Sequence, residues 1–200
     1  MATTPQTLYI IDGHAQIFSA YFAPMTGNLT SASGEPTKAT YIFTTMLFKL
    51  LKESKPDMLV VTLDAPGATF RNELYDQYKA NRPPIPEDLP VQINRITSVL
   101  QAMNIPTFSL EGYEADDLIG TLVKKGAEKG FQIYICSKDK DLEQLIGPGV
   151  AMLSLKTGDV TDEAALLEKK GIRPNQVIDV LSLSGDTADN IPGVPGIGPG

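Results

Sequence analysis

The 200-residue sequence contains one cysteine, one histidine and no tryptophan. A single cysteine, Cys136, has no partner for a disulfide or a cysteine metal site, and its apolar neighbours indicate a buried thiol. Because His14 is the only histidine, a Ser-His-Asp triad would depend on that one residue, and the motifs of zinc enzymes are absent. The composition therefore argues against thiol, histidine and zinc chemistry.

The sequence also lacks any apolar run that approaches the length of a membrane span. The short run 8–11 has no basic flank ahead of it, so the pattern of a signal sequence is missing. We therefore expect a cytoplasmic protein that makes no contact with membranes. With 42% hydrophobic and 20% charged residues, the chain is long enough to bury a core as one large domain or as one domain with a small appendage.

The most informative stretch is 112–122, where Glu114, Asp116 and Asp117 precede apolar residues at helical spacing. This spacing predicts a helix that turns Glu114 and Asp117 toward one edge near Asp116. Two carboxylates about 6 Å apart repel by about 3 kcal/mol at an effective dielectric of 20, whereas a helix N-terminus stabilises each carboxylate by only about 0.3–1 kcal/mol. A bound cation would resolve the repulsion. The alternative is that these acids only decorate the first turn of a helix.

Short apolar, β-branched runs alternate with helical patterns along the chain. The predicted strands are 8–11, 58–63, 107–110, 131–136 and 150–155, and the predicted helices are 15–22, 40–51, 89–103, 115–129, 142–146, one capped by Thr161, and 174–183. This alternation predicts a three-layer α/β fold around a mostly parallel sheet.

Acids recur where the predicted strands end. Asp12, Asp64 and the pair Asp139 and Asp141 each follow a strand, and parallel sheets bind ligands at the carboxyl ends of their strands. Each of these acids alone could be a turn residue or a helix cap. Their repeated position favours one shared site.

Two further acids, Asp186 and Asp189, are three residues apart, so that one helical turn could aim both at the same centre. The complete set of candidate metal ligands is Asp12, Asp64, Glu114, Asp116, Asp117, Asp139, Asp141, Asp186 and Asp189. If one metal site holds all nine, the rest of the chain has 24 − 9 = 15 acids against 17 Lys and Arg, or about +2. The net charge of −7 is therefore compatible with a nucleic-acid partner.

One segment combines basic and aromatic side chains. Arg71, Tyr75, Tyr78 and Arg82 fall on one predicted helical stripe, with Lys79 beside it. Such a stripe can grip a phosphate chain and stack bases, although a solvated amphipathic helix is the alternative.

The end of the sequence is rich in glycine and proline. Gly193, Gly196 and Gly198 would allow backbone N–H groups to approach phosphate oxygens, often together with a monovalent cation such as K⁺. The alternative interpretation is a flexible tail.

Six motifs stand in order along nearly the whole chain. They are I-D-G-H at 11–14, D-A-P-G-x-T-F-R at 64–71, Y-K-A-N-R-P-P at 78–84, E-A-D-D at 114–117, D-K-D at 139–141 and G-D-x-x-D-N-I-P-G-V-P-G-I-G at 185–198. Together they resemble the 5′ to 3′ exonuclease domain of bacterial DNA polymerase I, which belongs to the 5′-nuclease or flap endonuclease family. The resemblance implies a PIN-like domain over residues 1–183, with a helical arch at about 68–88. Residues 184–200 would begin a helix-hairpin-helix.

The resemblance also implies an activity. The expected protein uses two or more Mg²⁺ or Mn²⁺ ions to hydrolyse DNA near 5′ ends, flaps or nicks, in repair and in the removal of RNA primers. The nine carboxylates would bind metal, some through water, and Arg71 and Lys79 would stabilise the transition state. Tyr78, Lys79 and Arg82 would lie at the base of the arch. The glycines would hold duplex DNA, and a polymerase domain on the same chain is a further partner that the family suggests.

Two features depart from the family pattern. Ser19 stands where the family usually has an arginine, and the sequence reaches only the first half of the hairpin motif, as in a fragment of a longer protein. One alternative is therefore a DNA-binding module that has lost nuclease activity, although the retention of all nine acids weighs against it. A metal-dependent phosphatase for small molecules is another, but an aspartyl nucleophile motif is missing.

Overall fold

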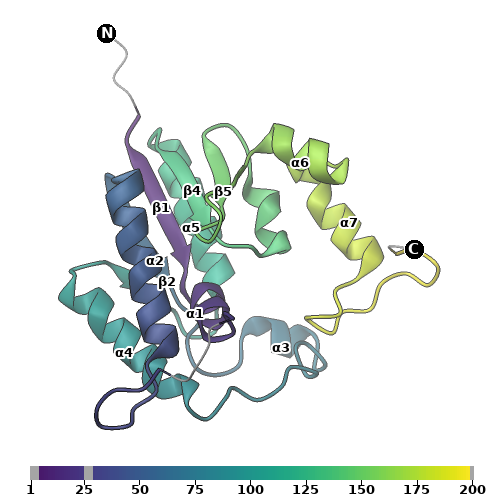
Figure 1. Cartoon of the computed structure of the whole chain (residues 1–200). Helices are drawn as coiled ribbons and strands as arrows, with labels where there is room; N and C mark the ends of the chain where they lie inside the picture. Colours follow the sequence, from purple (N-terminus) through teal and green to yellow (C-terminus); the bar gives the residue numbers. More distant parts are fainter. Residues whose placement is uncertain (1–4, 25–28, 199–200) are drawn as a thin grey trace.

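Within residues 5–24 and 29–198, which the computed structural model describes, six strands form one sheet in the order β3-β2-β1-β4-β5-β6 (Figure 1). The strands are β1 (Thr7–Asp12), β2 (Met58–Thr62), β3 (Thr107–Phe108), β4 (Gln132–Cys136), β5 (Val150–Leu153) and β6 (Val160–Thr161). All neighbours pair in parallel except β5 and β6, which are antiparallel. The predicted mostly parallel sheet is confirmed.

Helices cover both faces of this sheet. The helices of the described chain are α1 (Gly13–Tyr21), α2 (Lys38–Ser54), α3 (Phe70–Leu74), α4 (Leu89–Ala102), α5 (Ala115–Glu128), α6 (Glu163–Lys170) and α7 (Val177–Ser184), with the 3₁₀ helices η1 (Lys140–Leu145) and η2 (Pro174–Gln176). One hydrophobic core joins the sheet to α1, α2 and α4, and a second joins it to α5, η1, α6 and α7. The predicted three-layer α/β architecture is therefore confirmed.

The central strand β1 shows how the sequence produces these layers. Ile10 and Ile11 are both fully buried, and they belong to different cores because successive side chains point to opposite faces of a strand. The chain then turns directly from β1 into α1 at Gly13. A Cβ atom there would lie 2.5 Å from Cδ2 of Leu63 and 2.7 Å from the carbonyl oxygen of Thr62, so only glycine fits. This tight turn places Asp12 at the carboxyl edge of the sheet.

Several local predictions were wrong. The helix predicted through Arg82 ends at Leu74, and the segment that follows consists of turns. Asp162 caps α6 in place of Thr161, because its carboxylate accepts the N–H of Ala165 at 2.9 Å, while Thr161 belongs to β6 and pairs with Met152 of β5. These differences arise because tertiary contacts override local periodicity.

The chain after α7 is a loop as far as residue 198, so a second helix of the expected hairpin motif is not seen in the described residues. Asp186 and Asp189 lie on this loop and not on a helical turn, since Asp186 forms an isolated antiparallel bridge with Ile191. Figure 1 shows the loop approaching the segment that contains α3. In the described part of the chain, no helix has both the length and the apolar character needed to span a bilayer.

Candidate metal and nucleic-acid site

Asp12 and its neighbours form a first acidic centre where the parallel strands end. This centre comprises Asp12, Asp64, Asp116 and Asp139, which come from β1, the loop after β2, α5 and the loop after β4. Oδ1 of Asp12 accepts the N–H of Ala15 at 3.1 Å and caps α1. Capping thus fixes an acid at the edge of the sheet, as the sequence predicted.

Burial and repulsion perturb the first acidic centre. Burial raises the pKa of Asp12, and the charges of Asp64 and Asp139 raise it further, against the opposing hydrogen bonds that Asp12 accepts. Burial, followed by the charges of Asp12 and Asp139, raises the pKa of Asp116 to about 7. Carboxylates that repel one another in this way are typical of a site completed by a cation.

A second acidic centre comprises Asp141, Asp186 and Asp189. One carboxylate oxygen from each lies within 4.8 Å of the others. Burial, together with the charges of Asp139 and Asp186, raises the pKa of Asp141 to about 6. Its Oδ1 atom is buried without a hydrogen-bond partner. Converging oxygen donors with an unpaired buried oxygen fit a hard divalent cation such as Mg²⁺ or Mn²⁺.

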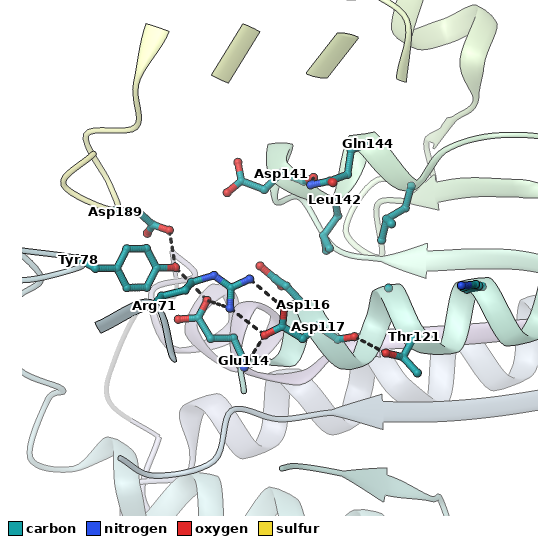
Figure 2. Close-up of a pocket in the computed structure, with 13 residues that line it drawn as sticks. Arg71, Tyr78, Glu114, Asp116, Asp117, Thr121, Asp141, Leu142, Gln144 and Asp189 are labelled. Carbon is teal, nitrogen blue, oxygen red and sulfur yellow. Dashed lines mark hydrogen bonds and ion pairs between the residues drawn. The ribbon is translucent and has the colours of Figure 1, made fainter. Parts of the chain in front are cut away.

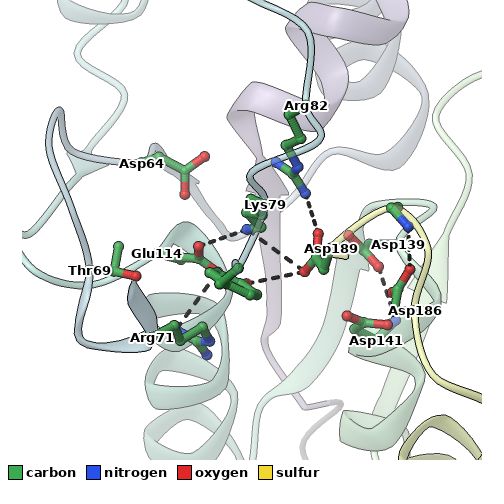
Figure 3. Close-up of polar contacts among 12 residues, drawn as sticks. Asp64, Thr69, Arg71, Lys79, Arg82, Glu114, Asp139, Asp141, Asp186 and Asp189 are labelled. Carbon is green, nitrogen blue, oxygen red and sulfur yellow. Dashed lines mark hydrogen bonds and ion pairs between the residues drawn. The ribbon is translucent and has the colours of Figure 1, made fainter. Parts of the chain in front are cut away.

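Cations from the predicted arch already contact several of the acids (Figures 2 and 3). Arg71 makes a bidentate pair with Asp117, with N–O distances of 2.8 and 2.9 Å. Nζ of Lys79 lies 2.7 Å from Oε1 of Glu114. Glu114 and Asp117 thus pair with cations, and they also form a capping box at the start of α5. The structure brings all nine predicted acids to one edge of the sheet, but it divides them into three groups. These are the first acidic centre, the second acidic centre, and the pair Glu114 and Asp117, which contacts cations.

The third cation, Arg82, contacts Asp189 at 2.6 Å. One cleft of about 420 Å³ is lined by Asp116 of the first centre, by Asp141 and Asp189 of the second, and by the paired acids Glu114 and Asp117. Its walls come from α5, η1, the arch and the loop after α7. A polyanion that entered this cleft would meet the guanidinium of Arg71 beside these acids.

Tyr78, within the predicted arch, is buried against the acids. Its hydroxyl lies 2.9 Å from Oε2 of Glu114 and 3.1 Å from Oδ2 of Asp189, as Figure 2 shows. Burial and the charges of these two carboxylates raise the pKa of Tyr78, so the hydroxyl stays protonated and can donate. Because Tyr78 is 8% exposed, it does not share an open face with Tyr75, which is 39% exposed. The predicted single stripe is therefore wrong.

Lys79 has a left-handed backbone conformation, with φ of 57°. Its N–H donates to the carbonyl oxygen of Asp189 at 3.0 Å. Side-chain amides reinforce this junction, since Asn81 donates to the carbonyl oxygen of Thr187 and Asn190 to that of Gln77, both at 2.7 Å. A non-glycine residue in this conformation costs about 1–3 kcal/mol and persists only where its surroundings hold it. The junction between arch and loop provides that support.

The three predicted phosphate-binding glycines have different surroundings. A Cβ atom on Gly193 would lie 2.3 Å from the carbonyl oxygen of Ser184, so glycine is needed there for close backbone packing. Gly196 has φ of 82°, and neither it nor Gly198 has an atom within 4 Å of an added Cβ. Their contact with DNA remains a prediction.

Some site residues were not singled out from the sequence. Nδ1 of His14 accepts the backbone N–H of Asp64 at 3.0 Å, Ser137 donates to Oδ2 of Asp12 at 2.7 Å, and Lys140 lies 3.1 Å from Asp186. All three lie within two positions of a predicted acid in the sequence. That proximity was the only sequence signal that could have identified them. Ser19, which replaces the expected arginine, is exposed on α1 in a groove that it shares with Lys49.

Fold and site together define an α/β domain in which clustered carboxylates lie beside cationic side chains at the carboxyl edge of a mostly parallel sheet. Residues 7–171 match the family model described as the 5′-3′ exonuclease, N-terminal resolvase-like domain. The chain belongs to this family.

Known proteins support this membership. A 5′-3′ exonuclease from Aquifex aeolicus is 42% identical over 194 residues, which cover 97% of this chain and 66% of that protein. A DNA polymerase I from Bacillus caldotenax is 42% identical over 197 residues, which cover 96% of this chain and 22% of that protein. The chain therefore spans just under two thirds of the first relative and about a fifth of the second.

A solved structure extends the comparison. The bacteriophage T5 flap endonuclease, in a complex with DNA and metal ions, matches with a TM-score of 0.74 and 25% identity, over 96% of this chain and 71% of that chain. The same fold is thus known in a protein that binds both DNA and metal.

Proposed function

We propose that this chain is a divalent-metal-dependent 5′ to 3′ exonuclease and structure-specific flap endonuclease that hydrolyses DNA phosphodiesters near 5′ ends. The observation that carries the proposal is that two acidic centres lie beside Arg71, Lys79 and Arg82, which contact acids at the same edge of the sheet. The names of the relatives and the T5 complex with DNA and metal ions agree with it.

The two acidic centres would hold at least two ions of Mg²⁺ or Mn²⁺. Asp12, Asp64, Asp116 and Asp139 would serve one, and Asp141, Asp186 and Asp189 the other, with Glu114 and Asp117 contributing through water. Divalent ions held there supply an acidified water and offset charge on the phosphodiester oxygens. The protein residues fix the ligand oxygens through helix caps and hydrogen bonds before the substrate arrives.

The arch cations would stabilise the charge that develops on the phosphate. Arg71 and Lys79 each contact a carboxylate that a phosphate oxygen can replace, because both groups offer oxygens with similar geometry. Interactions with such preorganised donors become stronger as negative charge develops on the phosphate, so they stabilise the transition state and accelerate the reaction. Arg82 would hold the strand farther along the arch.

The substrates proposed are 5′ flaps, nicks and 5′ ends, including RNA primers on DNA. Residues 1–183 would form the catalytic domain, with the arch at about 68–88, and 184–200 would start a duplex-binding hairpin motif with a bound K⁺. We also propose a cytoplasmic location and roles in replication and repair. In the DNA polymerase I relatives the matching region is only part of the protein, and a polymerase domain on the same chain is therefore among the proposed partners.

The test compares hydrolysis of a 5′-flap DNA with that of a small phosphate ester in Mg²⁺. We expect flap cleavage that EDTA abolishes and little ester hydrolysis. Asp116→Asn and Asp141→Asn should each lower the cleavage rate by at least about 100-fold, because each removes a ligand charge. Asp179→Asn, an exposed change on α7, is the matched control. Flap binding in Ca²⁺ without cleavage in Mg²⁺ or Mn²⁺ would favour a DNA-binding module instead.

A further inference from the structure

The cleft beside the acids continues along α5, which runs away from the carboxyl edge of the sheet toward the start of β4. Asp116 and Asp117 lie in the first turn of this helix. Lys124 follows Asp117 by seven positions, or about 11 Å along the helix axis, and lines the same cleft. We name this continuation the α5 channel. It is lined by Gly120, Thr121 and Lys124 of α5 and by Gln144 and Leu145 of η1.

Gly120 lies inside α5, where packing does not require a glycine. Glycine in a helix interior is less stable than alanine, so its presence needs a reason. For Gly126 of the same helix the reason is packing, since an added Cβ atom would lie 2.9 Å from Cδ1 of Ile133. At Gly120 an added Cβ atom would lie 3.9 Å from Cδ2 of Leu145, which is an ordinary contact. The missing side chain instead leaves the α5 channel open and lets another molecule approach the helix backbone closely.

The far end of the α5 channel presents groups that can bind an anion. Lys124 is exposed and forms no ion pair with any residue that the structure describes, whereas the three cations of the arch all pair with acids. On the facing wall, Nε2 of Gln144 donates to the carbonyl oxygen of Asp141 at 2.8 Å, and the second hydrogen of this amide is available to a ligand. Figure 2 shows Thr121 and Gln144 on the two sides of the channel. An ammonium group and an amide N–H are donors that phosphate oxygens accept.

We propose that the α5 channel binds the displaced single strand of a 5′ flap, with Lys124 and Gln144 holding one of its phosphates about two helical turns from the acids. The inference rests on the proposed nuclease function and deepens it. The whole cleft measures about 420 Å³, which is the size of a small-molecule site, so it admits one strand and excludes a duplex. In a flap substrate the unpaired strand is joined directly to the phosphodiester that is cut. Its backbone would pass over Gly120, where no side chain blocks the channel.

Fluorescence anisotropy in Ca²⁺ tests the contact without cleavage, on one duplex that carries a flap of either one nucleotide or about six. Lys124→Ala should weaken binding of the longer flap about tenfold, as for the loss of one charged hydrogen bond, and lower the slope of log affinity against log salt by about 0.7. Binding of the one-nucleotide flap should not change, because that flap is too short to reach Lys124. Lys125→Ala is the matched control, since Lys125 lies in the last turn of α5 and does not line the cleft. No loss with the longer flap, or an equal loss with both flaps, would overturn the proposal.

Substitutions at Gly120 provide a second test. Gly120→Ala and Gly120→Leu both replace a poor helix former, so thermal melting should show each variant to be at least as stable as the wild-type protein, but only leucine fills the α5 channel. In Mg²⁺, Gly120→Leu should cleave the longer flap about tenfold more slowly than Gly120→Ala and the one-nucleotide flap at the same rate. Equal rates for the two variants on the longer flap would contradict the channel. Wild-type cleavage of the one-nucleotide flap checks the nuclease assignment separately, so a protein that cleaves it but shows neither effect keeps that assignment and loses the channel.

Discussion

At the scale of single residues, Lys79 combines a left-handed backbone with an ammonium group 2.7 Å from Glu114. We predict that Lys79→Met lowers the rate of flap cleavage by about 10²–10³-fold, because it removes a preorganised charge and keeps the apolar stem. The backbone should not change, since both side chains have a Cβ atom. Single-turnover cleavage in Mg²⁺ measures the rate, and anisotropy in Ca²⁺ measures binding.

The control for this prediction is Lys125→Met, an exposed lysine in the last turn of α5. It removes the same charge far from the arch contacts. If Lys79→Met and the control cleave equally fast, Lys79 does not act on the transition state.

Sequence reasoning located the acids well but not their partners. Asp12 and Asp64 could be placed because strand ends in a parallel sheet meet at one edge. The ion pair between Asp117 and Arg71, which are 46 positions apart, could not be predicted, because such a pair depends on the final path of the arch. The burial of Tyr78 was missed for the same reason, since local periodicity placed it on an open stripe.

At the scale of elements, the loop after α7 depends on close backbone packing. A Cβ atom on Gly193 would lie 2.3 Å from the carbonyl oxygen of Ser184 and 2.9 Å from the backbone nitrogen of Gly185. We therefore predict that Gly193→Ala displaces the loop that carries Asp186 and Asp189, weakens metal binding and slows cleavage. Calorimetric titration with Mn²⁺ measures the loss of affinity directly.

Gly198→Ala is the matched control for the loop, because an added Cβ atom there has no neighbour within 4 Å. The control should bind Mn²⁺ like the wild-type protein. If the two alanine variants have the same affinity, the packing at Gly193 does not position the second acidic centre.

Strands and long helices were predictable because their apolar periodicity is strong, as in β1 and α5. The arch was not, because a segment with only five helical residues in α3 takes its shape from contacts with Glu114 and Asp189. The loop that carries Asp186 was likewise assigned a helical turn, whereas Asp186 pairs with Ile191 and residues 187–190 form turns between them.

At the scale of the whole molecule, clustered acids should make stability depend on divalent metal. A ligand that binds only the folded state at 100 times its Kd stabilises it by about 2.7 kcal/mol, or about 5–10 °C for a chain of this size. We predict such a rise in Tm with millimolar Mg²⁺ in low-salt buffer, and a rise with Ca²⁺ also. Asp141→Asn combined with Asp186→Asn should reduce it. An unchanged Tm in both ions would count against the shared site.

The metal-free protein should also lose stability as the pH rises. In the folded state the pKa of Asp116 is about 7 and that of Asp141 about 6, compared with 3.8 for an ordinary aspartate. Between about pH 4 and 7 the folded protein therefore retains protons that the unfolded chain has released, so the free energy of unfolding falls with increasing pH. Thermal melts in EDTA from pH 5 to 8 should show this fall. Asp116→Asn should flatten the curve, and an identical slope in that variant would contradict the assignment.

The junction between arch and loop has a consequence for the newly made protein. It joins Gln77 to Asn190 and Asn81 to Thr187, which are 113 and 106 positions apart in the chain. Closing so long a loop has a large entropic cost, so these contacts should form late in folding. On the ribosome, the segments with Asp12, Asp64 and Asp116 emerge well before the loop with Asp186 and Asp189. The nascent chain therefore passes through a stage in which most of the acids are present but the cleft cannot yet be completed.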